Sequence, residues 1–192
     1  MSCSIEILRL DEANVEPHHI VGFIHVYQDA FSGPPWFENH PTKRVYEMVF
    51  LEHLPHCLVL ALDGREVVGL ACCHPVLAEV NTGNHVREFL TAHREIAPFP
   101  LEQTIYQSEV AVLSSYRRQH IAEKLTLARF DWARGQGLTH YTMRTEPNGS
   151  LSKPLYEKLG ARIAKGLVQP ISPGADEVKS ESKERIYLWG KL

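Results

Sequence analysis

The chain has 192 residues, of which 44% are hydrophobic and 22% are charged, and its formal net charge is −3 at pH 7. This balance indicates one ordered domain with a full core and gives no sign of a nucleic-acid or membrane-surface partner. The N-terminal residues do not resemble a signal peptide, and the cysteines show no disulfide spacing. We therefore expect a cytoplasmic protein with reduced thiols.

The first half of the chain predicts a strand, two helices and a β-hairpin. Alternating apolar residues predict a strand at 4–10, and apolar residues at helical spacing behind Pro17 predict a helix at 17–31. A second helix is expected at 42–54. Two β-rich runs joined by Asp63-Gly64 predict a hairpin over residues 57–76.

The second half predicts alternating strands and helices that follow a less regular segment. This segment, residues 76–104, is long for a plain connection and contains a short predicted helix at 86–96. Helices interleaved with strands indicate an α/β sheet of mixed direction. The remaining strands are expected at 105–113, 139–145, 161–169 and 184–192, and the helices at 117–137 and 152–160.

The stretch SSYRRQHIAEKL, residues 114–125, places two adjacent arginines at the head of a helix expected to begin near Arg117. The first N–H groups of a helix have no intrahelical partners, and the helix dipole adds partial positive charge there. Such a turn is suited to a phosphate. The alternative is a solvated first turn with Ser115 as its N-cap, and spacing alone favours that alternative.

The segment SEVAVLSSYRRQHIAEKL resembles motif A of the GNAT superfamily of acyl-CoA-dependent N-acyltransferases, in particular N-acetyltransferases of the bacterial type. In that motif a strand leads into Arg/Gln-x-x-Gly-x-Gly/Ala at the head of a long helix. Further along, LYEKLGAR resembles motif B of the same family. The matching residues are Arg117, Ile121 and Ala122 in the first motif and Tyr156, Leu159 and Gly160 in the second.

The chain departs from the family pattern in the phosphate turn. Arg118 and His120 stand where the family usually has glycine, which allows backbone to approach pyrophosphate closely. We expect a helical φ at His120, with its imidazole pointing outward or itself donating to phosphate. The asparagine expected before the tyrosine of the second motif is displaced by one position, to Asn148.

The resemblance implies the GNAT fold, a central mixed and mostly antiparallel sheet of about six or seven strands with helices on both faces. It implies one acetyltransferase domain over residues 1–192, in which 76–104 is an insertion near the acceptor site. Acetyl-CoA is the implied co-substrate, and its pantetheine arm would lie between two splayed strands, 105–113 and 139–145. The implied cofactor-binding residues are Val110, Val112, Arg117, Arg118, Gln119, His120, Ile121, Ala122 and Asn148.

Acyl transfer from a thioester to an amine needs a neutral amine and a proton for the departing thiolate. Glu109 is the candidate base, because it lies in mid-strand among apolar residues where the family often has a catalytic or substrate-binding glutamate. Tyr156 is the candidate acid, since the resemblance places it near the sulfur. A surface-facing glutamate and a packing tyrosine are the alternatives.

Histidines and cysteines cluster near the predicted hairpin and raise the alternative of a zinc site. Adjacent cysteines on a strand face opposite sides, however, and the spacing matches no common zinc motif. We therefore predict no metal, with thiols in the core and histidines at the surface. The residues concerned are His53, His56, Cys57, Cys72, Cys73 and His74; Cys3 is the fourth cysteine.

The loop after the first helix contains Trp36, Phe37 and Glu38, which could receive a cationic amine or could equally pack as a lid. We predict an N-acetyltransferase that moves an acetyl group from acetyl-CoA to a primary amine by direct attack in a ternary complex. The acceptor is expected to be a small-molecule or peptide amine, and a homodimer stays open. The alternative function is a catalytically weak CoA-binding or regulatory module with the same fold.

Overall fold

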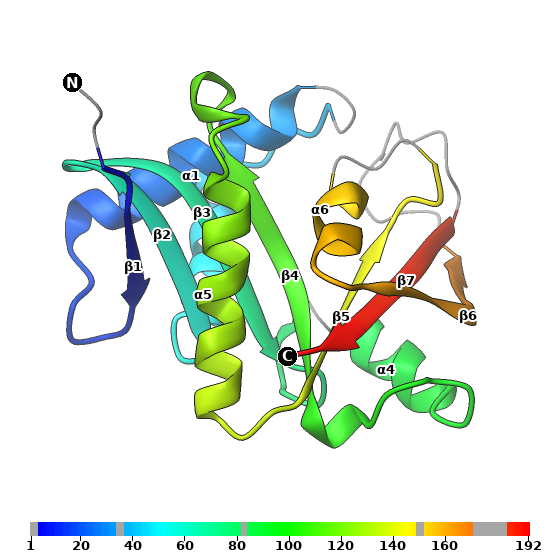
Figure 1. Cartoon of the computed structure of the whole chain (residues 1–192). Helices are drawn as coiled ribbons and strands as arrows, with labels where there is room; N and C mark the ends of the chain where they lie inside the picture. The colour runs from blue at the N-terminus through cyan, green and yellow to red at the C-terminus, as the bar shows by residue number, and fades with distance from the viewer. Residues whose placement is uncertain (1–3, 34–36, 82–83, 149–151, 171–183) are drawn as a thin grey trace.

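The computed structural model describes residues 4–33, 37–81, 84–148, 152–170 and 184–192 (Figure 1). Seven strands form one sheet in the order β1-β2-β3-β4-β5-β7-β6. Its adjacent strands are antiparallel except β4 and β5, which are parallel. The strands are β1 (Glu6–Leu10), β2 (Cys57–Asp63), β3 (Glu66–Pro75), β4 (Thr104–Val112), β5 (His140–Thr145), β6 (Arg162–Pro170) and β7 (Glu184–Lys191). The mixed, mostly antiparallel α/β sheet is thus confirmed.

Two long helices, α1 (Pro17–Ser32) and α5 (Ile121–Gly135), cover opposite faces of the first four strands, with α5 in front and α1 behind in Figure 1. The helix predicted at 42–54 has the expected extent but is not uniform. It consists of α2 (Thr42–Val45), a π-helical turn (Tyr46–Phe50) and α3 (Leu51–His53). The shorter helices α4 (Asn84–Ala92) and α6 (Lys153–Lys158) lie beside the other half of the sheet.

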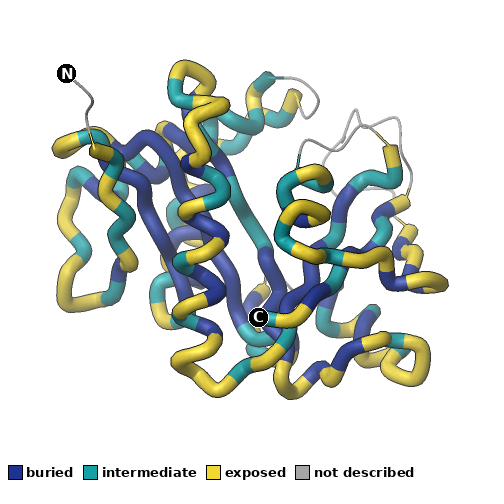
Figure 2. Tube along the Cα trace, viewed as in Figure 1, coloured by how far each residue is buried: buried dark blue, intermediate teal, exposed yellow. Residues whose placement is uncertain are grey.

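The strands β2 and β3 are buried on both faces, which explains their continuous apolar sequence (Figure 2). Their hairpin turns at Gly64, whose φ of +63° suits the first central position of a two-residue turn. Cys57, Cys72 and Cys73 are buried thiols, as expected, and burial raises the pKa of Cys72 and Cys73 well above the ordinary value. Cys3 lies outside the described residues.

The segment 76–104 forms a second apolar cluster with β6 and β7. Val86 and Leu90 of α4 pack in this cluster together with Leu167 and Tyr187. The Gln169 side-chain amide also donates to the His85 carbonyl at 3.0 Å. The segment therefore joins the half of the sheet that lies beyond β5. Across the described ranges, none of the helices is both long and apolar enough to cross a membrane.

The close approach of α1 to β3 depends on Gly22, where a Cβ atom would lie 2.5 Å from Val67 Cγ2. Alanine is favoured over glycine in a helix by about 1 kcal/mol, but overpacking a core costs about 1–3 kcal/mol. We expect Gly22→Ala to lower the free energy of unfolding measured by urea denaturation. Gly135→Ala is the matched control, because nothing lies within 4 Å of its added Cβ, and it should be neutral or stabilising. Equal stability of the two variants would contradict the close approach.

Candidate active site

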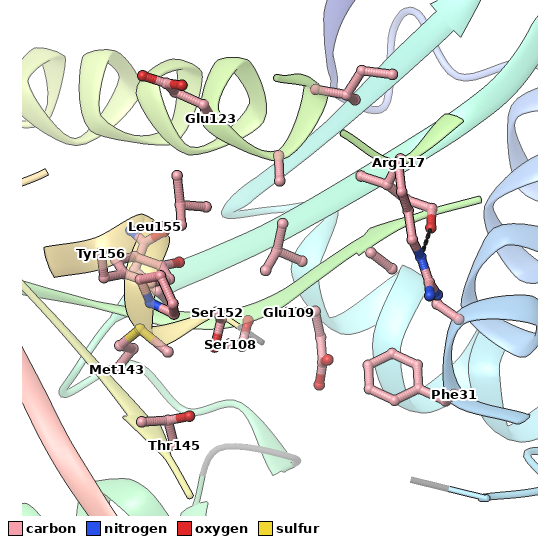
Figure 3. Close-up of a pocket in the computed structure, with 18 of the residues that line it drawn as sticks. Phe31, Ser108, Glu109, Arg117, Glu123, Met143, Thr145, Ser152, Leu155 and Tyr156 are labelled. Carbon is pink, nitrogen blue, oxygen red and sulfur yellow. Dashed lines mark hydrogen bonds between the residues drawn. The ribbon is translucent and has the colours of Figure 1, made fainter. Parts of the chain in front are cut away.

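A cleft opens where β4 and β5 separate. The two strands pair only between Thr104–Tyr106 and His140–Thr142, and they diverge beyond these residues. The cleft has a volume of about 980 Å³ and is bordered by β4, β5, α1, α6 and the start of α5 (Figure 3). The predicted splay of the two central strands is therefore confirmed.

The edge of β4 that faces the cleft presents backbone N–H groups. On the other edge, the Leu113 N–H donates to the Val68 carbonyl of β3 at 3.0 Å. Successive N–H groups of a strand point to opposite edges, so those of Val112 and Val110 face away from β3. Both residues line the cleft. The N–H groups of Val110 and Val112 therefore point toward the cleft.

A bulge in β4 lies in the wall of the cleft. Cys72 of β3 is opposite Glu109, whereas Cys73 is opposite Gln107, so Ser108 is an extra residue in β4. Arg129 of α5 is fully buried beneath this bulge. Its Nη1 donates to the carbonyl oxygens of Cys72 and Glu109, both at 2.9 Å.

The turn before α5 differs from the sequence prediction in two respects. The helix begins at Ile121 and not near Arg117, and His120 has a φ of +59° in place of the expected helical value. Arg118 also has a positive φ, of +64°. The reason is that the backbone follows a left-handed path for which glycine is the usual residue, although histidine adopts this conformation more often than most.

This turn nevertheless reaches the cleft. Figure 3 shows Arg117 at the end of β4, where its Nε donates to the Val112 carbonyl at 3.3 Å. Gln119 and Asn148 do not line the cleft, so the structure does not bring these two predicted residues to it. The predicted residues of the turn that do line it are Arg117, Arg118, His120, Ile121 and Ala122.

A carboxylate at the first turn of α5 is neutralised by a lysine. Lys158 Nζ donates to both carboxylate oxygens of Glu123 at 2.8 Å, and this hydrogen bond is the main cause of the lowered pKa of Glu123. The neighbouring His120 Nδ1 lies 3.1 Å from Glu123 Oε2. The negative charge of Glu123 is thus balanced at the end of the cleft where anion binding is expected.

Glu109 projects from the bulge into the cleft and is half-buried (Figure 3). Burial is the main cause that raises its pKa to about 8, and the nearby charge of Glu38 adds to the shift. Arg144 and Arg129 act in the opposite direction. Glu109 therefore holds a proton at neutral pH and releases it under mildly alkaline conditions. A second cavity, of about 80 Å³, touches Glu109 together with Tyr27 and Met48.

Tyr156 of α6 lines the same cleft, although only 1% of its surface is exposed. Its phenol oxygen accepts a hydrogen bond from Arg129 Nη2 at 2.9 Å. Because a guanidinium group can only donate, the phenol proton remains available to another group. The sequence analysis missed Arg129, yet it lies four residues after Leu125 and four before Ala133, on the buried stripe of α5.

The expected acceptor region is only partly assembled by the first loop. Glu38 lines the cleft, and its Oε2 lies 2.6 Å from His40 Nε2. Phe37 is 56% exposed and does not line the cleft, and Trp36 lies outside the described residues. Cleft residues at this end that the sequence analysis did not single out are Tyr27, Phe31, His85, Tyr106, Arg144 and Arg185.

The prediction that the histidines near the hairpin lie at the surface is wrong for His53 and His74, which are both buried, whereas His56 is half-buried. Burial lowers the pKa of His53 and of His74 to about 4, so both are neutral. His53 Nδ1 donates to the Val49 carbonyl at 2.8 Å, and its Nε2 lies 2.8 Å from Ser108 Oγ. In the part of the chain that the structure describes, no three His, Cys, Asp or Glu side chains are grouped to hold a metal ion.

A seven-stranded sheet with two splayed central strands, a long cleft between them and a helix N-terminus at one end defines the architecture of an acyl-CoA-dependent transferase. The family model described as "Acetyltransferase (GNAT) family" matches residues 21–161. The chain therefore belongs to the GNAT acetyltransferase family.

One curated relative is N-alpha-acetyltransferase 30 of Schizosaccharomyces pombe, which is 26% identical over 138 residues, covering 72% of this chain and 79% of the relative. Solved structures with the same fold include Ard1 from Thermoplasma volcanium (12% identity, TM-score 0.62, 97% of each chain covered). Another is yncA from Salmonella typhimurium with its cofactor acetyl-CoA (13% identity, TM-score 0.65, covering 98% of this chain and 94% of that one).

The turn before α5 can be tested by calorimetric titration with coenzyme A. Arg117→Glu should weaken the affinity at least several-fold, because it reverses a charge beside the expected phosphate position. Arg134→Glu is the control, since Arg134 lies in the last turn of α5 and pairs with Asp131. His120→Gly should keep or improve the affinity, because glycine relieves a conformation that costs about 1–2 kcal/mol for other residues. If Arg117→Glu binds coenzyme A with wild-type affinity, the assignment of phosphate binding to this turn is wrong.

Proposed function

We propose that this protein is an N-acetyltransferase that transfers an acetyl group from acetyl-CoA to a primary amine by direct attack in a ternary complex. The observation that carries the proposal is the convergence of three features in one cleft. These are the unpaired edge of β4, the N-terminus of α5 with its arginines, and the pair Glu109 and Tyr156. A single domain over residues 1–192, to which the segment 76–104 contributes His85 at the cleft, is part of this proposal.

Acetyl-CoA fits the residues that are present. The amides of Val110 and Val112 are oriented to bind an extended pantetheine arm as an added strand. Arg117 and Arg118, which follow Val112 at the end of β4, match the charge of pyrophosphate. The yncA structure with its cofactor acetyl-CoA has the same fold and supports this choice.

The chemistry follows from the protonation states of two side chains. Glu109 in its ionised form accepts a proton from the acceptor ammonium, and the neutral amine then attacks the thioester carbonyl carbon. The Val110 N–H donates to the carbonyl oxygen as negative charge develops there. Tyr156 gives its phenol proton to the departing thiolate. The attacking nitrogen loses its second proton to the phenolate as the amide forms, which restores Tyr156, and Glu109 releases the first proton to solvent.

The acceptor that we favour is the amine of a peptide or protein. The S. pombe relative is named an N-alpha-acetyltransferase, which supports an α-amine. Glu38 and Glu109 supply carboxyl groups for an ammonium, and Phe31 and Tyr27 supply aromatic surface for a neighbouring side chain. A small-molecule amine is the competing acceptor.

A second candidate is a module that binds coenzyme A with little turnover. The observation in its favour is the phosphate turn, which contains no glycine and places two other residues at positive φ. Such a module would bind acetyl-CoA without releasing thiol in the presence of any amine. It needs neither Glu109 nor Tyr156 in the cleft.

The function is tested by calorimetry with acetyl-CoA followed by a thiol-release assay over a panel of amines. Peptides with a free N-terminus should release coenzyme A, and the same peptides with a blocked N-terminus should not. Release with small amines alone would assign a small-molecule acceptor. Binding without release from any amine would favour the CoA-binding module, and the absence of binding would exclude both functions.

Glu109 gives the enzyme an expected pH dependence. Its pKa of about 8 predicts that the wild-type rate rises with pH and levels off above pH 8, where the carboxylate is ionised. Glu109→Gln should lower the rate by about 10²–10⁴-fold near pH 8. Part of this loss should be recovered toward pH 10, because a growing fraction of the amine is then neutral. A Gln variant with the wild-type profile would show that Glu109 is not the base.

A further inference from the structure

We infer that Arg129 is a positioning residue for acyl transfer, which holds the Val110 amide and the Tyr156 hydroxyl in the orientations that the reaction needs. This inference rests on the proposed function. It gives a role in the reaction to a residue that contacts neither acetyl-CoA nor the acceptor amine. The chain of contacts begins at the bulge in β4, passes through one guanidinium group and ends at the phenol of α6.

Arg129 binds two carbonyl groups at the bulge, one from each of the two strands. Cys72 and Glu109 are opposite each other at the register shift, and both of their carbonyl oxygens accept from Arg129 Nη1 at 2.9 Å. Ser108 Oγ also donates to the Cys72 carbonyl, at 3.1 Å. Arg129 therefore fixes the local shape of the bulge from the α5 side.

The hydrogen bond to Glu109 also orients the amide of the next residue. In a planar trans peptide the carbonyl of Glu109 and the N–H of Val110 point in opposite directions. With the carbonyl held toward Arg129, the N–H is directed to the other edge of β4, where Val110 lines the cleft. A cation on the carbonyl oxygen further polarises this peptide, which strengthens the N–H as a donor.

The other terminal nitrogen of the same guanidinium group, Nη2, contacts Tyr156, the candidate acid. Arg129 Nη2 donates to the Tyr156 phenol oxygen at 2.9 Å and to Thr126 Oγ1 at 3.0 Å. When Tyr156 gives up its proton, the phenol oxygen becomes negative beside a fixed positive charge. Arg129 thus stabilises the product of that proton transfer and holds the ring in place before it.

Stability alone is a poor explanation for Arg129. The side chain has no exposed surface, its Nε has no hydrogen-bond partner, and no carboxylate within the described residues forms an ion pair with it. Taking an isolated charge out of water is expensive, and apolar residues of similar size are often equally stabilising. A buried cation aimed at two groups of the reaction cleft is better explained by a role in positioning them.

The first test is a set of four proteins: wild type, Arg129→Lys, Tyr156→Phe and the double variant. Lysine keeps the charge but cannot reach both sets of partners, so kcat should fall by about 10- to 100-fold. The KM for acetyl-CoA should change by less than about threefold, because the group acts on chemistry and not on cofactor binding. In the Arg129→Lys background, Tyr156→Phe should cost several-fold less than it does in the wild type.

Controls separate this role from packing. Arg134→Lys on the exposed face of α5 should leave kcat unchanged, and circular dichroism melts show which variants are folded. Arg129→Met is a second, apolar variant with a larger expected loss of kcat. If Arg129 only stabilises the fold, the effects of Arg129→Lys and Tyr156→Phe will multiply to within about twofold, and the inference is then wrong.

The second test needs no turnover. Infrared spectra of acetyl-CoA with a ¹³C-labelled carbonyl report how strongly the bound carbonyl is polarised. We expect the carbonyl stretch to move to lower frequency on binding to the wild type and to return toward the free value in Arg129→Lys. An equal shift in both proteins would overturn the role at Val110. A wild type that shows the shift but acetylates no amine would instead refute the proposed function.

Discussion

The unpaired edge of β4 is the constraint on which the cleft depends. A central strand of a sheet normally satisfies its N–H and C=O groups on both sides, yet β4 pairs with β5 over only three residues. The amides beyond that point need another partner, either water or an extended ligand. Because they are regularly spaced and partly covered by α1 and α6, a ligand with alternating donors and acceptors satisfies them better than isolated waters can.

The bulge and the divergence of the strands act together. At the bulge, the carbonyl oxygens of Cys72 and Glu109 both accept from Arg129 of α5. With the bulge, Arg129 occupies the gap between β3, β4 and α5, and its charge then lies under the cleft wall. Arg144 and, to a smaller extent, Arg129 oppose the rise in the pKa of Glu109 that burial causes.

The strands of the sheet could be predicted well from the sequence, because hydrophobic periodicity and turn residues are local signals. The hairpin of β2 and β3 could be placed from Asp63-Gly64, and both buried strands from their continuous apolar runs. The splay, Glu109 and Tyr156 were reached through the family resemblance, since no local pattern reports that two strands diverge.

Other features could not be predicted from local patterns. The start of α5 was placed too early because SSYRRQH contains no glycine to mark a left-handed turn. The buried state of His53 and His74 depends on how α3 packs near β3, which the sequence alone does not determine. Arg129 was overlooked because its partners, the carbonyl oxygens of a bulge, come from strands distant in the sequence. A charged residue on an apolar helical stripe was the available signal.

The turn before α5, residues 117–120, follows a left-handed backbone path without a glycine. Arg118 and His120 keep positive φ values at a cost of about 1–2 kcal/mol each. Strained conformations persist when the surrounding structure determines them, and they concentrate at functional sites. If this turn had no anion to bind, a helix continued back to Arg117 would relieve the strain with the same residues. The strained path at the cleft therefore supports the proposal that the start of α5 binds an anion.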